Sequence, residues 1–164
     1  MQSSTEALPL GRMLAIFTGI LVAANLVLAA VGYLFPDLPI PSSMGIVLAM
    51  VAAMSSGQSA TKILSRRLVF REKAVFAVLA TGVSVVLGVG VLWAFFAYFG
   101  VPFTLESVIL VMTGDAVPAE EIRQILSWVI PLVLVLYLVI TYFGAAMGSR
   151  NEVKLREKLA AKGK

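Results

Sequence analysis

Two residue types that carry much of protein chemistry are missing from this chain of 164 residues, which contains neither cysteine nor histidine. The absence of cysteine excludes disulfide bonds, thiolate metal sites and a cysteine nucleophile. The absence of histidine removes the commonest metal ligand and the commonest general base. We therefore expect no enzymatic activity, no cofactor and no metal site.

Charged residues are also scarce, at 13% of the chain, whereas 60% of the residues are hydrophobic. Soluble domains contain about 25% charged and about 45 to 50% apolar residues. The apolar residues are grouped into four blocks, and most charges lie between or after these blocks. The composition predicts an integral membrane protein, namely an all-α four-helix bundle that forms a single transmembrane domain over residues 1–164.

The four apolar blocks predict membrane spans at residues 13–35, 44–64, 74–100 and 127–147, because about 20 helical residues cross about 30 Å of hydrocarbon. A basic loop at residues 65–73 joins the second and third spans, and a basic tail at residues 148–164 follows the fourth. Ser149 and Glu152 have the spacing of a capping box, which predicts a helix start in this tail.

The outer loop at residues 101–126 is the longest segment outside the predicted spans. Thr104 is placed to cap a short apolar helix that ends at Met112. That helix is too short to cross a bilayer, so we expect it to lie on the membrane surface, with a re-entrant segment as the alternative. Pro118 is then expected to start the next helix, with Glu120 and Glu121 in its first turn.

The basic residues predict the orientation of the chain. With this assignment of spans, all 13 Lys and Arg residues except Arg123 lie on one side of the membrane. An excess of Lys and Arg marks the cytoplasmic side, so both termini are predicted to be cytoplasmic. We interpret the net charge of +4 as a topology signal, not as a nucleic-acid surface. The main determinants are Lys62, Arg66, Arg67, Arg71 and Lys73.

Small residues recur at every fourth position of the second span, which predicts one face where another helix backbone approaches closely. We call this face the α-ridge of the second span; its members are Gly45, Ala49, Ala53 and Gly57. The same span carries polar side chains that lipid should not meet, so we expect it to lie inside the bundle. Asn25 in the first span and Gln58 in the second are further packing candidates, because amides in lipid usually bond to neighbouring helices.

The stretch from Ser55 to Ala80 combines this small-residue span, a step at Gly57 and Gln58, and a basic loop closed by Glu72. In these features the chain resembles an uncharacterised family of small four-span bacterial inner-membrane proteins. The resemblance covers the four-span layout over nearly the whole chain. It implies a multi-pass location in the bacterial inner, or cytoplasmic, membrane, and it implies no particular activity.

Two classes of function remain open. The first is a noncatalytic membrane protein that acts by helix packing as an accessory or structural subunit, either with a membrane-protein partner or as a homo-oligomer within the lipid bilayer. The alternative is a small oligomeric transporter or channel that passes its substrate along Asn25, Gln58 and Ser84. Such transport would not be proton-coupled, because none of the 9 acidic residues lies within a predicted span. A holin-like pore former is a further option.

Overall fold

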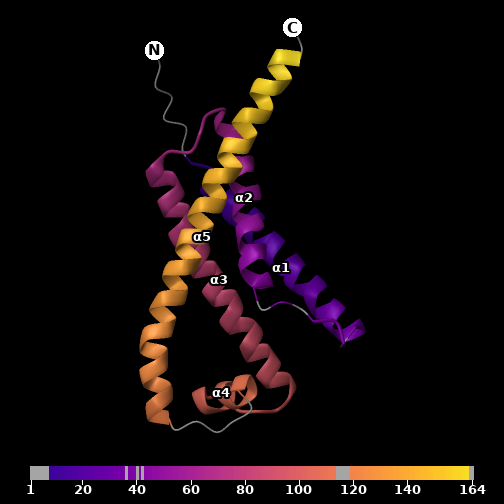
Figure 1. Ribbon diagram of the computed structural model, residues 1–164, viewed down its shortest axis with the longest axis vertical. Coiled ribbons are helices and arrows are strands. Elements are labelled where there is room, and N and C mark those ends of the chain that lie inside the picture. The colour runs from indigo at the N-terminus through magenta and orange to yellow at the C-terminus, as the bar shows by residue number, and fades with distance from the viewer. Residues whose placement is uncertain (1–7, 36, 40, 42, 114–118, 163–164) are drawn as a thin grey trace. The chain divides into compact units, whose positions relative to one another are not determined.

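The computed structural model describes residues 8–35, 37–39, 41, 43–113 and 119–162, and throughout these residues it contains helices and no strands (Figure 1). The helices are α1 (Leu10–Leu34), α2 (Met44–Leu64), α3 (Phe70–Tyr98), α4 (Leu105–Thr113) and α5 (Ala119–Lys162). All of them except α4 are long and apolar enough to cross a membrane. A helix suits lipid because it satisfies its backbone hydrogen bonds internally. The predicted all-α class, with four helices of spanning length, is confirmed.

The helix bounds differ from the predicted spans at several ends. Helix α2 covers the same residues as the predicted second span, whereas α1 begins at Leu10 and α3 begins at Phe70, both earlier than expected. The largest difference is in α5, which continues without a break to Lys162. The capping-box interpretation of Ser149 and Glu152 is therefore wrong. Both residues lie inside a helix, because the segment around them packs against α2 and is held helical there.

The outer segment contains the short helix that was expected, α4. The Oγ1 atom of Thr104 accepts a hydrogen bond from the backbone N–H of Ser107 at 3.2 Å, so Thr104 caps α4 as predicted. Helix α5 carries Glu120 and Glu121 in its first turn, where carboxylates favour the helix dipole. Pro118, the expected start of that helix, lies outside the described residues.

The chain divides into two compact units. The first, unit 1, contains α1, α2, the part of α3 up to Thr81 and the part of α5 from Tyr137. Its core includes Phe17 of α1 and Phe76 of α3, whose rings meet edge to face with centroids 5.8 Å apart. Helix α2 is the most enclosed of the long helices, with 39% of its most apolar stretch buried, against 22% or less in the others. Its polar residues Ser56 and Thr61 are fully buried, as the sequence led us to expect.

The second unit, unit 2, covers residues 82–136 and contains the second part of α3, α4 and the first part of α5. Phe96 and Ile122 are its most deeply buried large side chains, each 2% exposed. The ring of Phe96 meets that of Phe103 at 5.6 Å between centroids, which ties the end of α3 to the segment before α4. This aromatic contact thus fixes the segment that leads into α4.

Candidate functional site

In unit 1, α2 packs closely against the part of α5 at residues 144–148. Ala49 and Ala53 of the α-ridge are fully buried, and Gly57 is buried as well. On α5, Gly144 lies directly against the ridge. A Cβ atom added to Gly144 would lie 2.8 Å from the Cβ of Ala53 and 2.8 Å from the carbonyl oxygen of Met50. The small side chains therefore allow the two backbones to approach one another.

Two further glycines meet backbone atoms of the opposite helix. A Cβ atom on Gly57 would collide with the carbonyl oxygen of Ala145 and would lie 2.9 Å from its Cα. A Cβ atom on Gly148 would collide with the carbonyl oxygen of Met54. These neighbours are main-chain atoms and cannot rotate away, so both positions require glycine. Gly144 and Gly148 form a G-x-x-x-G pair, a packing signal that was readable in the sequence but that our sequence analysis missed.

The other predicted packing residues lie elsewhere. Gly45 is exposed, and a Cβ atom there would make only an ordinary contact, 3.9 Å from the hydroxyl of Tyr137. Gln58 is half-buried in α2. Asn25 is exposed on α1, and its Nδ2 atom donates a hydrogen bond to the carbonyl oxygen of Leu21 in its own helix at 2.7 Å. The close crossing thus uses Ala53 and Gly57 and leaves Gly45 and Asn25 outside it.

A buried hydroxyl pair closes one end of the crossing. Thr61 of α2 donates a hydrogen bond to the Oγ atom of Ser149 in α5 at 2.9 Å, and both residues are at most 2% exposed. The same Oγ atom accepts the backbone N–H of Leu68 at 3.0 Å. Leu68 belongs to the segment between α2 and α3, so one serine side chain joins α2, this segment and α5.

Glu152 continues this polar cluster one turn further along α5. It is 6% exposed, and its carboxylate accepts a hydrogen bond from Arg156 at 3.2 Å and lies 4.0 Å from the ammonium of Lys62. Arg156 also donates to the carbonyl oxygen of Lys62 at 2.8 Å and to the hydroxyl of Ser65 at 3.3 Å. Ser65 ends α2 in the left-handed conformation, with φ of 52°. Arg156 therefore caps the C-terminus of α2 from another helix.

A second ion pair shapes the predicted basic loop. The guanidinium of Arg66 binds both carboxylate oxygens of Glu72, at 2.7 and 3.0 Å. Glu72 also accepts the backbone N–H of Val69 at 2.9 Å, one of the unpaired donors at the start of α3. Glu72 thus holds the backbone in place at the start of α3.

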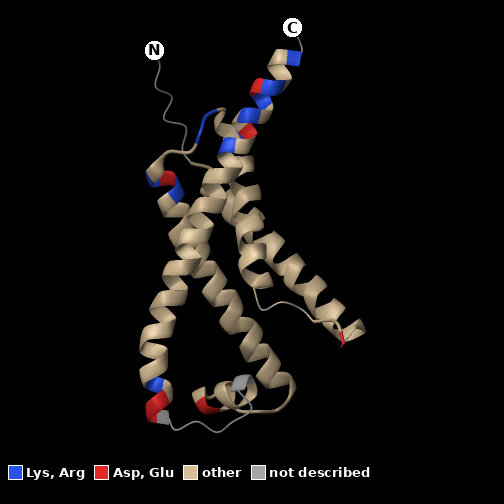
Figure 2. Cartoon of the chain, viewed as in Figure 1, with Lys and Arg blue, Asp and Glu red and all other residues tan. Residues whose placement is uncertain are grey.

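The remaining cations of this loop contact no carboxylate among the described residues. Arg67 and Arg71 are exposed, and the Lys73 ammonium lies 5.1 Å from the ring centroid of Tyr142 in α5. Figure 2 shows Lys and Arg residues gathered in this segment and in the last turns of α5. The loop therefore keeps net positive charge after its internal ion pairs are formed.

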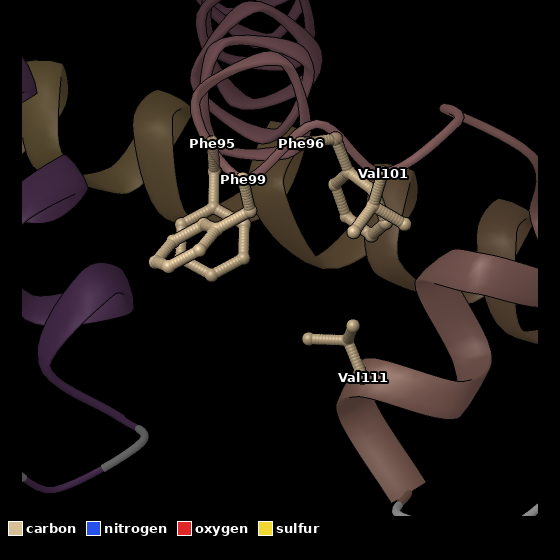
Figure 3. A pocket seen from close by; sticks show the side chains of 5 residues that line it. All are labelled: Phe95, Phe96, Phe99, Val101 and Val111. Carbon is tan, nitrogen blue, oxygen red and sulfur yellow. The ribbon is translucent and has the colours of Figure 1, made fainter.

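Unit 2 has a hollow of a different kind. An apolar pocket of about 260 Å³ lies between the end of α3 and α4 and is lined by Phe95, Phe96, Phe99, Val101 and Val111 (Figure 3). Its walls offer no polar atom that could orient a reacting group. Across the described part of the chain, moreover, no three acidic side chains gather into a group that could hold a metal ion.

Comparison with known proteins identifies no relative of this chain. No family model, no curated protein and no solved structure matches the chain.

Proposed function

We propose that this chain is a noncatalytic protein of the bacterial inner membrane that acts by helix packing as an accessory or structural subunit. The observation that carries the proposal is the placement of Asn25. Its amide lies near the middle of α1, a helix of spanning length, and is exposed on the outside of unit 1. A membrane-spanning helix of another protein, or of a second copy, is the partner that fits this position.

The physical argument rests on the hydrogen bonds that an amide can make. A primary amide has two donor hydrogens and two acceptor lone pairs, and the hydrogen bond to Leu21 uses one donor. Unpaired polar groups are costly in hydrocarbon, where no water replaces the missing partner. A neighbouring helix that presents a polar side chain, including another Asn25, would satisfy the remaining groups.

The surrounding face of α1 allows such an approach. Ala15, Val22 and Ala29 are exposed and recur at about the spacing that places them on the same side of the helix as Asn25. The buried side chains of α1 are Met13, Phe17 and Leu21, so the helix has left the core of unit 1 one turn before Asn25. The small side chains of Ala15 and Ala29 leave room for a second helix to approach this face.

The test is to compare Asn25→Leu with Asn25→Gln in affinity purifications from mild detergent, using two differently tagged copies and mass spectrometry of the eluate. Hydrogen bonds between membrane helices contribute about 0.6 to 2 kcal/mol, so Asn25→Leu should weaken recovery of the partner by about threefold to thirtyfold. Asn25→Gln keeps an amide at this position, so most of the partner recovery should be retained. Unchanged partner recovery with Asn25→Leu would contradict the proposal. A stable oligomer of this chain alone that survives Asn25→Leu would instead favour the transporter or channel alternative.

The proposed orientation has both termini in the cytoplasm. The partition of Lys and Arg supports it, since Arg123 alone lies on the other side of the predicted spans. The contacts of Arg156 with Lys62 and Ser65 are consistent with it, because they join the last turns of α5 to the end of α2. Membership in the family of small four-span bacterial proteins stays a prediction.

A further inference from the structure

An apolar groove runs along the surface of unit 1 between α3 and α5. Its volume is about 240 Å³, and it is open on one side. The ring of Tyr142 forms part of its wall, and the other lining residues are all apolar: Phe70, Ala74, Val78, Leu138, Val139 and Phe143. The residues from Phe70 to Val78 extend about 12 Å along α3 at 1.5 Å per residue. The wall beyond Lys73, from Ala74 to Val78, extends about 6 Å, which is less than half of one leaflet of a hydrocarbon core about 30 Å thick, so the groove fits the first part of an acyl chain.

One end of the groove is positively charged. The Lys73 ammonium lies over the ring of Tyr142, which is itself a wall of the groove. Arg71 is exposed two positions before Lys73, and neither residue contacts a carboxylate among the described side chains. Arg66 is different, because Glu72 binds it at both oxygens. An anion at this end would therefore meet cations that no acidic residue neutralises.

We propose that this groove binds an anionic phospholipid, with one acyl chain between α3 and α5 and the phosphate beside Lys73. The apolar walls fit a hydrocarbon chain, and the ammonium fits a phosphate as a compact charge with three donors. Lys73 also lies at the boundary between the basic loop and the apolar part of α3, where lipid headgroups are found. The proposal does not depend on the proposed function, because a lipid site can exist with or without a protein partner.

Binding is measured by native mass spectrometry of the detergent-purified protein titrated with phosphatidylglycerol or with phosphatidylcholine of the same acyl chains. Wild type should bind phosphatidylglycerol more tightly. Lys73→Gln should lose about fivefold in affinity for phosphatidylglycerol, as expected for one interfacial cation, and little for phosphatidylcholine. Lys158→Gln, which removes an exposed cation of α5 remote in sequence from the groove, is the matched control and should bind like wild type.

The acyl chain is tested separately with bulky substitutions in both walls. Val78→Trp and Val139→Trp each fill the groove from an exposed position, so at least one should fold normally, as judged by helical circular dichroism and size-exclusion chromatography. A folded variant should lose affinity for both lipids. The proposal is overturned if Lys73→Gln and Lys158→Gln lower affinity equally, or if the Trp variants bind as wild type does. Displacement of the lipid by inorganic phosphate at millimolar concentration would also overturn it, because the cations alone would then explain binding.

Discussion

At the scale of single residues, the contact between α2 and α5 depends on the absence of side chains. Gly57 and Gly148 each lie against a carbonyl oxygen of the opposite helix, whereas Gly11 and Gly19 of α1 have no atom within 4 Å of an added Cβ. In lipid there is little hydrophobic gain from bringing two apolar helices together, so van der Waals fit decides how tightly they associate. Glycine is therefore required for the helix contact at Gly57 and Gly148, whereas at Gly11 and Gly19 there is space for a larger side chain.

This difference predicts opposite effects of Gly→Ala substitutions. Gly148→Ala forces a methyl group onto the carbonyl oxygen of Met54, and overpacking of this kind costs about 1 to 3 kcal/mol. We expect a lower free energy of unfolding in a detergent titration followed by circular dichroism. Gly19→Ala is the control, and it should be neutral or stabilising by up to about 1 kcal/mol because alanine favours helix. Equal stability of the two variants would show that the helices separate easily at this point.

At the scale of helices, the sequence predicts α2 better than α5. The bounds of α2 are marked by prolines before it and by basic residues after it, so its limits follow from local signals. The end of the fourth span had a local signal too, the spacing of Ser149 and Glu152, but that signal was misleading. A capping box requires its serine outside the helix, whereas Ser149 lies within α5 and bonds to Thr61 and Leu68. Those partners are distant in sequence, so no local pattern could identify them.

The packing partners of α2 were equally hard to predict. The repeated small residues of α2 predicted a close contact, but they did not predict which helix makes it. Gly45 has the same four-residue spacing as the other members, yet it is exposed. Spacing places residues on one face of a helix, but the crossing of two straight helices covers only part of that face. Which part is covered depends on the position of α5, which the sequence of α2 does not contain.

The polar end of the crossing predicts that Glu152 stabilises the contact between α2 and α5. Glu152→Leu leaves Arg156 and Lys62 without their shared carboxylate, and because these side chains are 39% and 62% exposed to water, the expected cost is about 0.2 to 1 kcal/mol. We expect a lower midpoint of thermal unfolding in detergent. Glu157→Leu removes a carboxylate from an exposed position of the same helix, so its midpoint should stay close to that of wild type. If both variants unfold at the wild-type temperature, the cluster around Glu152 does not contribute to stability.

At the scale of the whole molecule, the apolar content predicts that the chain is a membrane protein, and the distribution of charge predicts which way it is oriented in the membrane. The four apolar blocks suffice to predict four helices of spanning length, because the hydrocarbon thickness alone sets the required length. Orientation depends on a different signal, the number of Lys and Arg residues on each side. The polar contacts add a physical link, since Arg156 joins the last turns of α5 to the end of α2. The loop and the tail therefore belong on the same side whichever side that is.

The predicted orientation can be tested with single cysteines, because the chain contains none of its own and gives no background labelling. Asp37→Cys lies in the connection between α1 and α2, and Ala160→Cys lies near the end of α5, both at exposed positions. With both termini in the cytoplasm, a membrane-impermeant maleimide should label Asp37→Cys in intact cells and should label Ala160→Cys after the membrane is permeabilised. The physical reason is that Lys and Arg concentrate on the cytoplasmic side of membrane proteins. With the opposite orientation, most of these residues would lie on the outer side. Labelling of Ala160→Cys in intact cells, with Asp37→Cys protected, would reverse the assignment and would also move the Lys73 end of the groove to the outer leaflet.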